Sequence, residues 1–282
     1  MTEYYTIAGI KLIITGEALP ERGPLRPFAC GKPEKPDTTI TLVGRPAGVE
    51  PAYHFSDRGA HWAELGDGGR YYRFFRDDGI VITDALISRG WDKIEIYANP
   101  GAGYAEYFMK PTLEAIFYNI CLLHNGIALH SSAVEWNGAG IVFSAPSGTG
   151  KSTQADLWVK NFGAKYINGD RPLLKFTGGE LLVCGTAWSG SAGLYKNVCV
   201  PMKALVFLEQ YPENRITPLG TSEALKKILP RCFLPYHDRE MMVLAMDIID
   251  AIIKRTACWR LQCTPDIGAA ELVMKCITEN RI

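Results

Sequence analysis

The sequence predicts an α/β fold in which a mainly antiparallel β region precedes a domain built around a glycine-rich loop. Three observations support this prediction. Short alternating apolar runs fill the first hundred residues, the hydrophobic period becomes helical from Pro111, and a strand-like run leads into Ala145-Pro146-Ser147-Gly148-Thr149-Gly150-Lys151-Ser152. We place the domain boundary between residues 105 and 106, which gives an N-terminal β-rich region of 1–105 and a second domain of 106–282.

The N-terminal region is predicted to form a twisted antiparallel sheet with long loops, because its apolar runs are short and are broken by Gly and Pro clusters. The clearest runs are Thr6–Thr15, Thr38–Val43, Tyr71–Phe75 and Lys93–Ala98. Pro24, Pro27, Pro33 and Pro36 predict a loop that lacks regular structure.

The second domain is expected to begin with a helix and a hairpin. Apolar residues between Leu113 and Leu123 share one helical face, and Pro111 suits the first turn. Two strand-like runs follow, Ile127–Trp136 and Gly140–Ser144, and the Asn-Gly pair between them is a strong hairpin signal. The glycine-rich loop therefore follows an antiparallel hairpin.

The run that begins at Ala145 has the features of a phosphate-binding loop (P-loop), although the strict pattern has glycine at that position. Backbone N–H groups of such a loop curl around the phosphates of a nucleotide, and the next helix presents its positive dipole end. Lys151 is expected to reach the outer phosphates and the Ser152 hydroxyl to bind Mg²⁺. The predicted nucleotide-binding residues are Ser147, Gly148, Thr149, Gly150, Lys151, Ser152 and Thr153.

Phosphoryl transfer to a hydroxyl also needs a group that accepts the hydroxyl proton. Asp170 is the best candidate, as base or as a Mg²⁺ ligand, because it follows the strand-like run Lys165–Ile167. The alternative is an aspartate that only bonds its own turn. Arg171 is expected either to stabilise charge on the transferred group or to form a surface ion pair.

Several segments resemble the HPr kinase/phosphorylase superfamily, which shares its nucleotide-binding core with phosphoenolpyruvate carboxykinases. The similar segments are Leu129–Val134, Gly140–Ser152, Ile167–Pro172 and Ala204–Glu209, within a likeness that covers about residues 110–275. The resemblance implies that His130 lies beside the reaction centre, whereas a lone strand histidine is more often a structural residue. It also implies two adjacent acids where this chain has Gly169 and Asp170.

Within that superfamily the chain is most similar to HPr-kinase-like proteins found beside peptide-modification genes, including kinases of lasso peptide precursors. The segments 168–172, 185–190 and 263–266 carry this likeness. It implies an ATP- and Mg²⁺-dependent kinase whose acceptor is a serine of a peptide or small protein. The alternatives are a kinase of a small-molecule hydroxyl such as free serine, a reverse phosphorylase activity, and an ATP-binding regulator that is inactive because one acid is missing.

Three further features each have two interpretations. Glu209 ends an apolar run, which is typical of an acid beside Mg²⁺ in ATPases and also of a plain strand end. The segment Trp188–Ser191 predicts either a mobile loop over the acceptor site or an ordinary connection. The helical run Glu240–Ile253 predicts a core helix or a subunit interface, so a homo-oligomer remains among the expectations.

Composition excludes several classes of function. Lys plus Arg number 30 and Asp plus Glu number 30, so the chain has no basic excess for nucleic acid or an anionic membrane. No apolar stretch is long enough to span a bilayer and no signal-peptide core follows Met1, which predicts a cytoplasmic protein. The eight cysteines are scattered without a Cys-x-x-Cys pair, and we expect reduced core thiols rather than metal ligands.

Overall fold

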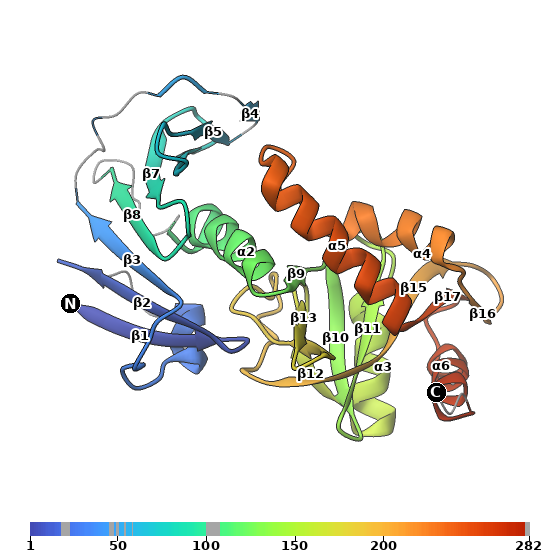
Figure 1. The fold of residues 1–282 in the computed structure, drawn as a ribbon. Helices are drawn as coiled ribbons and strands as arrows, with labels where there is room; N and C mark the ends of the chain where they lie inside the picture. Colours follow the sequence, from blue (N-terminus) through green and yellow to red (C-terminus); the bar gives the residue numbers. More distant parts are fainter. Residues whose placement is uncertain are drawn as a thin grey trace. The chain divides into compact units, whose positions relative to one another are not determined.

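The computed structural model describes residues 1–17, 23–44, 48, 51–53, 55–57, 59–99 and 108–279. The chain forms two compact units (Figure 1). The N-terminal unit comprises Met1–Ile120 with Tyr236–Asp238, and the C-terminal unit comprises Cys121–Pro235 with Arg239–Ile282. The described residues combine two sheets with several helices, in agreement with the predicted α/β class. The predicted boundary at residues 105 and 106 lies outside the described residues.

The sheet of the N-terminal unit has eight strands in the order β1-β2-β3-β8-β7-β6-β5-β4. Their bounds are β1 Thr2–Ile7, β2 Ile10–Gly16, β3 Thr38–Val43, β4 Phe55–Asp57, β5 Ala60–Glu64, β6 Arg70–Phe75, β7 Val81–Ile87 and β8 Lys93–Ala98. Strand β3 runs parallel to both β2 and β8, while the other neighbours are antiparallel. The sheet is therefore mixed, which its alternating sequence pattern does not reveal, because alternation is the same in both pairings.

One prediction for this unit was wrong in part, and one run is divided between two strands. The run Thr6–Thr15 forms a hairpin, since Ala8 and Gly9 both adopt left-handed φ angles of 52° and 77° and reverse the chain. The proline-rich stretch contains a 3-10 helix, η1 (Gly23–Phe28), because Leu25 and Phe28 bury their side chains.

The segment Tyr236–Asp238 is held in the N-terminal unit by polar contacts. The Arg70 guanidinium donates through Nε to Asp238 Oδ2 at 3.1 Å, and both side chains are almost fully buried. The Tyr72 hydroxyl lies 2.7 Å from Nε2 of His237. Burial lowers the pKa of His237, although the Asp238 carboxylate opposes this shift. The buried imidazole is therefore harder to protonate than a free histidine.

This pKa shift predicts a pH-dependent stability. Below the ordinary histidine pKa of 6.5, His237 is protonated in the unfolded chain but remains largely neutral in the folded chain. The unfolded state then binds more protons than the folded state, so the free energy of unfolding should fall as the pH drops. The slope contributed by one group is at most about 1.4 kcal/mol per pH unit. Urea unfolding of the wild type and of His237→Gln at pH 7.5 and pH 5.5 would measure it. Equal losses of stability in both proteins would contradict the assignment.

The sheet of the C-terminal unit has nine strands, with β12-β10-β11-β15-β14-β13-β9 in order and β17 pairing both β15 and β16. The strands are β9 Gly126–Ala128, β10 Ser131–Trp136, β11 Ala139–Ser144, β12 Lys165–Asn168, β13 Leu173–Thr177, β14 Glu180–Cys184, β15 Cys199–Gln210, β16 Arg215–Pro218 and β17 Ala257–Cys263. The helical segments are η3 Phe108–Leu113, α2 Glu114–Leu123, α3 Lys151–Phe162, α4 Thr221–Ile228, η4 Leu229–Arg231, α5 Arg239–Arg255 and α6 Ile267–Glu279. The division between the two units falls within α2.

The predicted hairpin before the glycine-rich loop is confirmed. Strands β10 and β11 pair antiparallel, and Asn137 and Gly138 between them have left-handed φ angles of 51° and 77°. The predicted strand Ile127–Trp136 is broken at Leu129 and His130, because β9 pairs with β13 while β10 pairs with β11 and β12. This break takes His130 out of the regular ladder.

Strands β11, β15 and β17 run parallel to one another. Their carboxyl ends therefore meet at one edge of the sheet, which is where α/β proteins usually bind ligands. The core beneath this edge packs α3 and α6 against these strands, with Trp158, Phe143 and Leu261 fully buried. The rigid core fixes the loop between β11 and α3.

One prediction about the cysteines was wrong. Cys184 and Cys199 form a disulfide, because they stand opposite each other in the antiparallel pair β14 and β15. Their separation of 15 residues gives no hint of this register. Cys30 is exposed rather than part of the core. The disulfide closes the segment 185–198, part of which approaches the candidate site.

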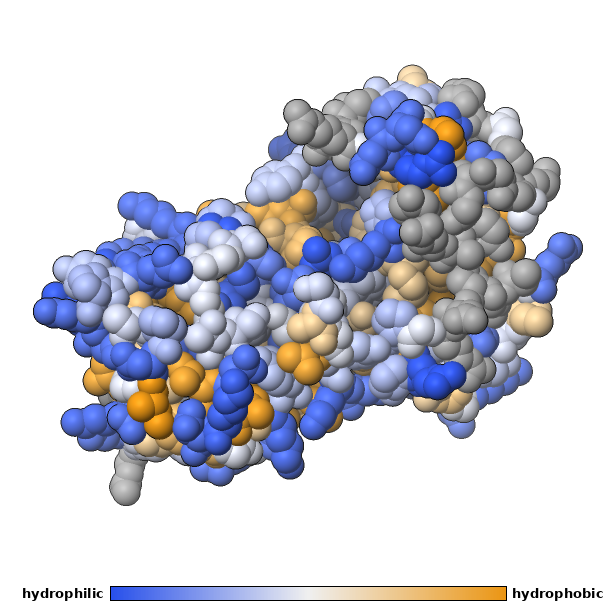
Figure 2. Space-filling model, turned by 180° about the vertical axis from the view of Figure 1, so that it is seen from behind, coloured by the Kyte–Doolittle hydropathy of each residue, from blue (hydrophilic) through white to orange (hydrophobic). Residues whose placement is uncertain are grey.

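No helix among the described residues is long and apolar enough to cross a membrane. On the face shown in Figure 2, hydrophilic side chains cover most of the surface and smaller hydrophobic groups lie between them.

Candidate active site

Residues 145–150 form the loop between β11 and α3. Gly148 and Gly150 have left-handed φ angles of 76° and 109°, and a Cβ built on either would meet no atom within 4 Å. Gly150 caps α3 without a side-chain hydrogen bond. The loop thus leaves open space above its backbone, and the first N–H groups of α3 have no side-chain cap. This local geometry suits an anion.

Lys151 is the first residue of α3, and only 8% of it is exposed. Its ammonium donates to the carbonyl oxygens of Ala145 and Pro146 at 3.1 and 3.2 Å. Burial lowers the pKa of Lys151, the Asp170 carboxylate raises it, and the Arg231 guanidinium lowers it further. The side chain therefore lies within the loop and next to groups of both charges.

A chain of polar contacts joins this lysine to the predicted catalytic residues. Lys151 Nζ lies 3.1 Å from His130 Nε2, and His130 Nδ1 lies 3.0 Å from Asp170 Oδ1. The ammonium can only donate, so Nε2 accepts and Nδ1 carries the proton that His130 shares with the carboxylate. On the other side, Asp170 Oδ2 lies 3.0 Å from Arg171 Nε. The structure thus brings His130, Asp170 and Arg171 together beside Lys151.

The turn that carries Asp170 is organised by another residue. Asn168 is fully buried, and its Oδ1 accepts the backbone N–H groups of Asp170 and Arg171 at 2.9 and 2.7 Å. Its Nδ2 donates to the carbonyl oxygens of Thr186 and Trp188 at 3.1 and 3.2 Å. The Asp170 side chain is therefore not used to build its own turn and faces His130 and Arg171 instead.

Arg171 does not lie in open solvent. Its guanidinium stands over the ring of Phe233, with 5.0 Å from Cζ to the ring centroid, in addition to its contact with Asp170. This arrangement orients the cation toward the carboxylate.

The segment after β14 packs directly against the carboxylate. Gly190 has a φ of 69°, and a Cβ there would lie 3.0 Å from Asp170 Cβ and 3.1 Å from its Cγ. Trp188 and Ser189 are buried, which anchors the segment where it begins. The role of Trp188–Ser191 as a mobile cover for an acceptor remains a prediction.

Gly190→Ala is expected to displace Asp170, because the new methyl group would crowd the carboxylate and would also require a left-handed alanine. Any activity that depends on Asp170 should fall by at least about tenfold, while the protein should lose roughly 1–2 kcal/mol of stability. Gly193→Ala is the matched control, since Gly193 also has positive φ but nothing lies within 4 Å of its Cβ position. Equal activity losses in the two variants would contradict this assignment.

These groups line a pocket of about 370 Å³. Its lining includes most of the predicted nucleotide-binding residues, and it also takes in His130, Asp170 and the segment 189–192. The predicted residues found there are Ser147, Gly148, Gly150, Lys151, Ser152 and Thr153. Thr149 and Arg171 do not line this pocket, and Thr149 borders two neighbouring ones.

The sequence interpretation missed Arg231. Its carbonyl oxygen accepts the backbone N–H of His130 at 2.7 Å, and its charge contributes to the lowered pKa of Lys151. Arg231 lies in a second pocket of about 430 Å³, together with Lys226 and Lys227. A single arginine in a short helical turn has no motif, so no sequence signal would have identified it.

Glu209 lines the second pocket and not the one that contains Asp170. Lys227 Nζ donates to its Oε1 at 2.5 Å. An ion pair at the strand end explains this glutamate without a metal ion.

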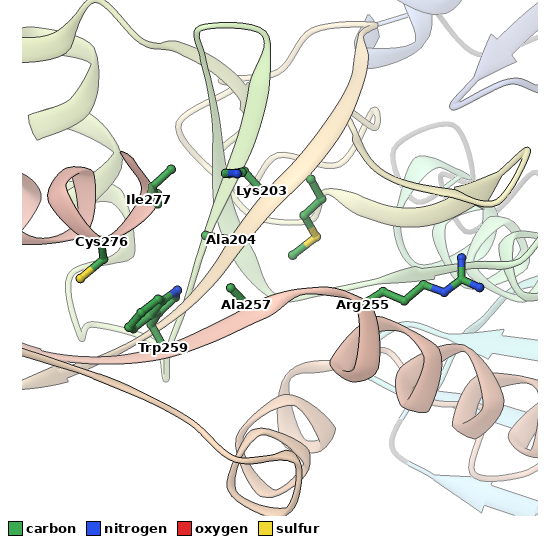
Figure 3. A pocket seen from close by; sticks show the side chains of 8 residues that line it. Lys203, Ala204, Arg255, Ala257, Trp259, Cys276 and Ile277 are labelled. Atoms are coloured by element: carbon green, nitrogen blue, oxygen red, sulfur yellow. The ribbon is translucent and has the colours of Figure 1, made fainter. Parts of the chain in front are cut away.

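A smaller pocket of about 140 Å³ lies near the amino end of β17 (Figure 3). Trp259, Ala257, Cys276 and Ile277 give it a mostly apolar lining. Arg255 extends away from Trp259 in Figure 3, and it donates to the carbonyl oxygen of Gly179 at 2.7 Å. This pocket lacks a carboxylate, and the carboxylate of the second pocket, Glu209, is paired with Lys227, so the candidate active site is the one beside Asp170.

Comparisons with known proteins give a distant likeness. No family model matches the chain, and no curated protein sequence is significantly similar to it. Among solved structures, the HPr(Ser) kinase/phosphatase from Coxiella burnetii is similar at 10% sequence identity and a TM-score of 0.34. The match covers 55% of this chain and 90% of that one. At this level of similarity we take no site residue or activity from the comparison.

Proposed function

We propose that the protein is a kinase that uses ATP and Mg²⁺ to phosphorylate a serine hydroxyl of a peptide or small protein. The contact chain from Lys151 through His130 to Asp170 carries this proposal. It places a carboxylate beside the lysine of a loop with the sequence and open backbone of a P-loop. Phosphoryl transfer depends mainly on such positioning and on charge stabilisation.

The residues present fit a nucleotide phosphate and its metal ion. The open backbone at Gly148 and Gly150 leaves room for phosphate oxygens, and Lys151 supplies a cation. The described residues contain no group of three His, Cys, Asp or Glu side chains that could hold a metal ion. Mg²⁺ would therefore depend on Ser152 and the phosphates, with Asp170 as a ligand only where it does not serve as the base, and it would neutralise phosphate charge when bound.

Asp170 is proposed to act as the general base. It would accept the proton of the acceptor hydroxyl as that oxygen bonds the γ-phosphorus, while the bond from this phosphorus to the bridging oxygen breaks and ADP leaves. His130 Nδ1 lies 3.0 Å from one carboxylate oxygen and Arg171 Nε lies 3.0 Å from the other, so the two side chains would orient the carboxylate. The small residues Ser189, Gly190 and Ala192 leave space for an acceptor in the same pocket.

A test is mass spectrometry of serine-containing peptides, HPr and free serine after incubation with ATP and Mg²⁺. A gain of one phosphate on a peptide or protein is the expected result. Phosphorylation of free serine alone would show that the acceptor is a small molecule and not a peptide or protein. Loss of phosphate from a phosphorylated acceptor together with conversion of inorganic phosphate to pyrophosphate would add a phosphorylase activity.

One observation favours a second candidate, an ATP-binding regulator without catalysis. Gly169 stands where the resembling family has an acid, so Asp170 is alone. A Cβ at Gly169 would meet its nearest atom, Ser189 O, at 3.4 Å, which is ordinary contact, so a Cβ fits at this position. ATP binding without any phosphorylated product in the wild type, followed by transfer in Gly169→Asp, would favour this regulator over the kinase.

A further inference from the structure

A separate pocket of about 500 Å³ opens on the other side of the glycine-rich loop. It lies where β15 and β17 end, beside the first turn of α3. This pocket and the pocket that contains Asp170 share three lining residues, Gly148, Gly150 and Thr153. A molecule whose phosphates lie on the loop can therefore extend past Thr153 into this space. The volume is in the range of small-ligand sites.

The walls of this pocket are held by hydrogen bonds. The backbone N–H of Tyr211 donates to the carbonyl oxygen of Cys263 at 3.1 Å, which ties the ends of β15 and β17 together. Asn214 Oδ1 accepts from the backbone N–H and hydroxyl of Thr264 at 2.9 and 3.1 Å. The site therefore needs little ordering when a ligand arrives.

Two features of the lining indicate what it binds. Tyr211 is 48% exposed, and with Pro212 and Pro265 it offers a flat apolar surface. Gln154 also lines the pocket and is only 2% exposed, yet its Oε1 has no hydrogen-bond partner. Its Nε2 has a long contact of 4.0 Å with Cys263 Sγ. A buried carbonyl oxygen without a donor is costly, and a ligand N–H would satisfy it once the amide turns from its closed position toward the pocket.

We propose that this pocket binds the nucleoside of the phosphate donor and prefers a purine with an exocyclic amine. Tyr211 stacks on the base, and Gln154 Oε1 accepts a hydrogen bond from the amine. Stacking on an aromatic side chain tolerates any base, so the amide supplies the selectivity. This inference rests on the proposed function, because it assumes that the phosphates occupy the loop.

Titration calorimetry with ATP, ITP and inorganic triphosphate, each with Mg²⁺, tests the inference. ATP should bind at least about tenfold more tightly than triphosphate through stacking. ITP, which has no exocyclic amine, should bind roughly three- to tenfold more weakly than ATP. Tyr211→Ala should bring ATP close to triphosphate, whereas Tyr236→Ala, which removes a tyrosine that is 71% exposed elsewhere, should change neither affinity.

The outcomes separate this inference from the proposed function. Equal affinities for ATP and triphosphate in the wild type would overturn the nucleoside site and leave the phosphate cradle in place. Equal affinities for ATP and ITP would overturn the role of Gln154, and this measurement needs no variant. Gln154→Met, in a protein with unchanged thermal unfolding, should make ATP and ITP equal. If none of the three ligands binds, both the nucleoside site and the proposed function fail.

Discussion

Asp170→Asn is expected to slow phosphoryl transfer by roughly 10²- to 10⁴-fold while ATP affinity changes only a few fold. The amide keeps the size of the carboxyl group but cannot take the proton of an acceptor hydroxyl. It also places an NH₂ group or a neutral oxygen opposite His130 Nδ1 and Arg171 Nε, the two groups that hold the carboxylate at 3.0 Å each. Single-turnover assays with the acceptor found by mass spectrometry would measure the rate of transfer.

Asp156→Asn is the matched control for this variant. Asp156 is half-buried on α3 and accepts a hydrogen bond from the Tyr166 hydroxyl at 2.8 Å, but it does not line the pocket beside Asp170. Its replacement should leave the transfer rate within about threefold of the wild type. A wild-type rate in Asp170→Asn would exclude this residue as the base, and equal losses in both variants would indicate a general loss of structure.

Local sequence signals predicted the elements around the site because those elements form from neighbouring residues. The Asn137-Gly138 turn sets the hairpin register, and the continuous apolar run Ile141–Phe143 indicates that β11 is buried on both faces. The loop motif begins directly after β11, and α3 begins at Lys151, the residue before Ser152. These features need no information about distant parts of the chain.

Contacts between distant segments were not predictable in the same way. The disulfide of Cys184 with Cys199 depends on how β14 and β15 align, and the contact of Gly190 with Asp170 depends on how the segment after β14 returns to the turn held by Asn168. The same is true of Arg231, which lies beside His130 only because Leu129 and Cys232 form a bridge. Sequence spacing encodes none of these registers.

The resemblance implied that His130 lies beside the reaction centre, and the structure adds its links to Asp170 and Lys151. If His130 had only a structural role, its two ring nitrogens would form hydrogen bonds with backbone groups only. Instead its two ring nitrogens lie 3.1 Å from an ammonium and 3.0 Å from a carboxylate. A histidine between the lysine of the glycine-rich loop and the acid is placed to keep the two charges at a fixed separation.

Lys151→Ala is expected to weaken ATP binding by roughly 10- to 100-fold, since hydrogen bonds to charged groups contribute about 1.5–3 kcal/mol each. The variant should also lower the transfer rate, because Lys151 provides positive charge where the transferred phosphate would lie and donates to His130 Nε2. Two loop carbonyls, those of Ala145 and Pro146, lose their donor at the same time. Calorimetry with ATP and Mg²⁺ would measure the affinity.

Lys160→Ala serves as the control, because Lys160 is exposed on the same helix and does not line the pocket. It should bind ATP as the wild type does. Lys151→Arg keeps the charge but introduces a larger, planar group. Lys151 is only 8% exposed, so the site has little room for this group and the variant should restore little of the lost affinity. Full ATP affinity in Lys151→Ala would mean that the phosphates do not lie on this loop. The kinase proposal would then have neither a phosphate-binding loop nor a cation beside the phosphates.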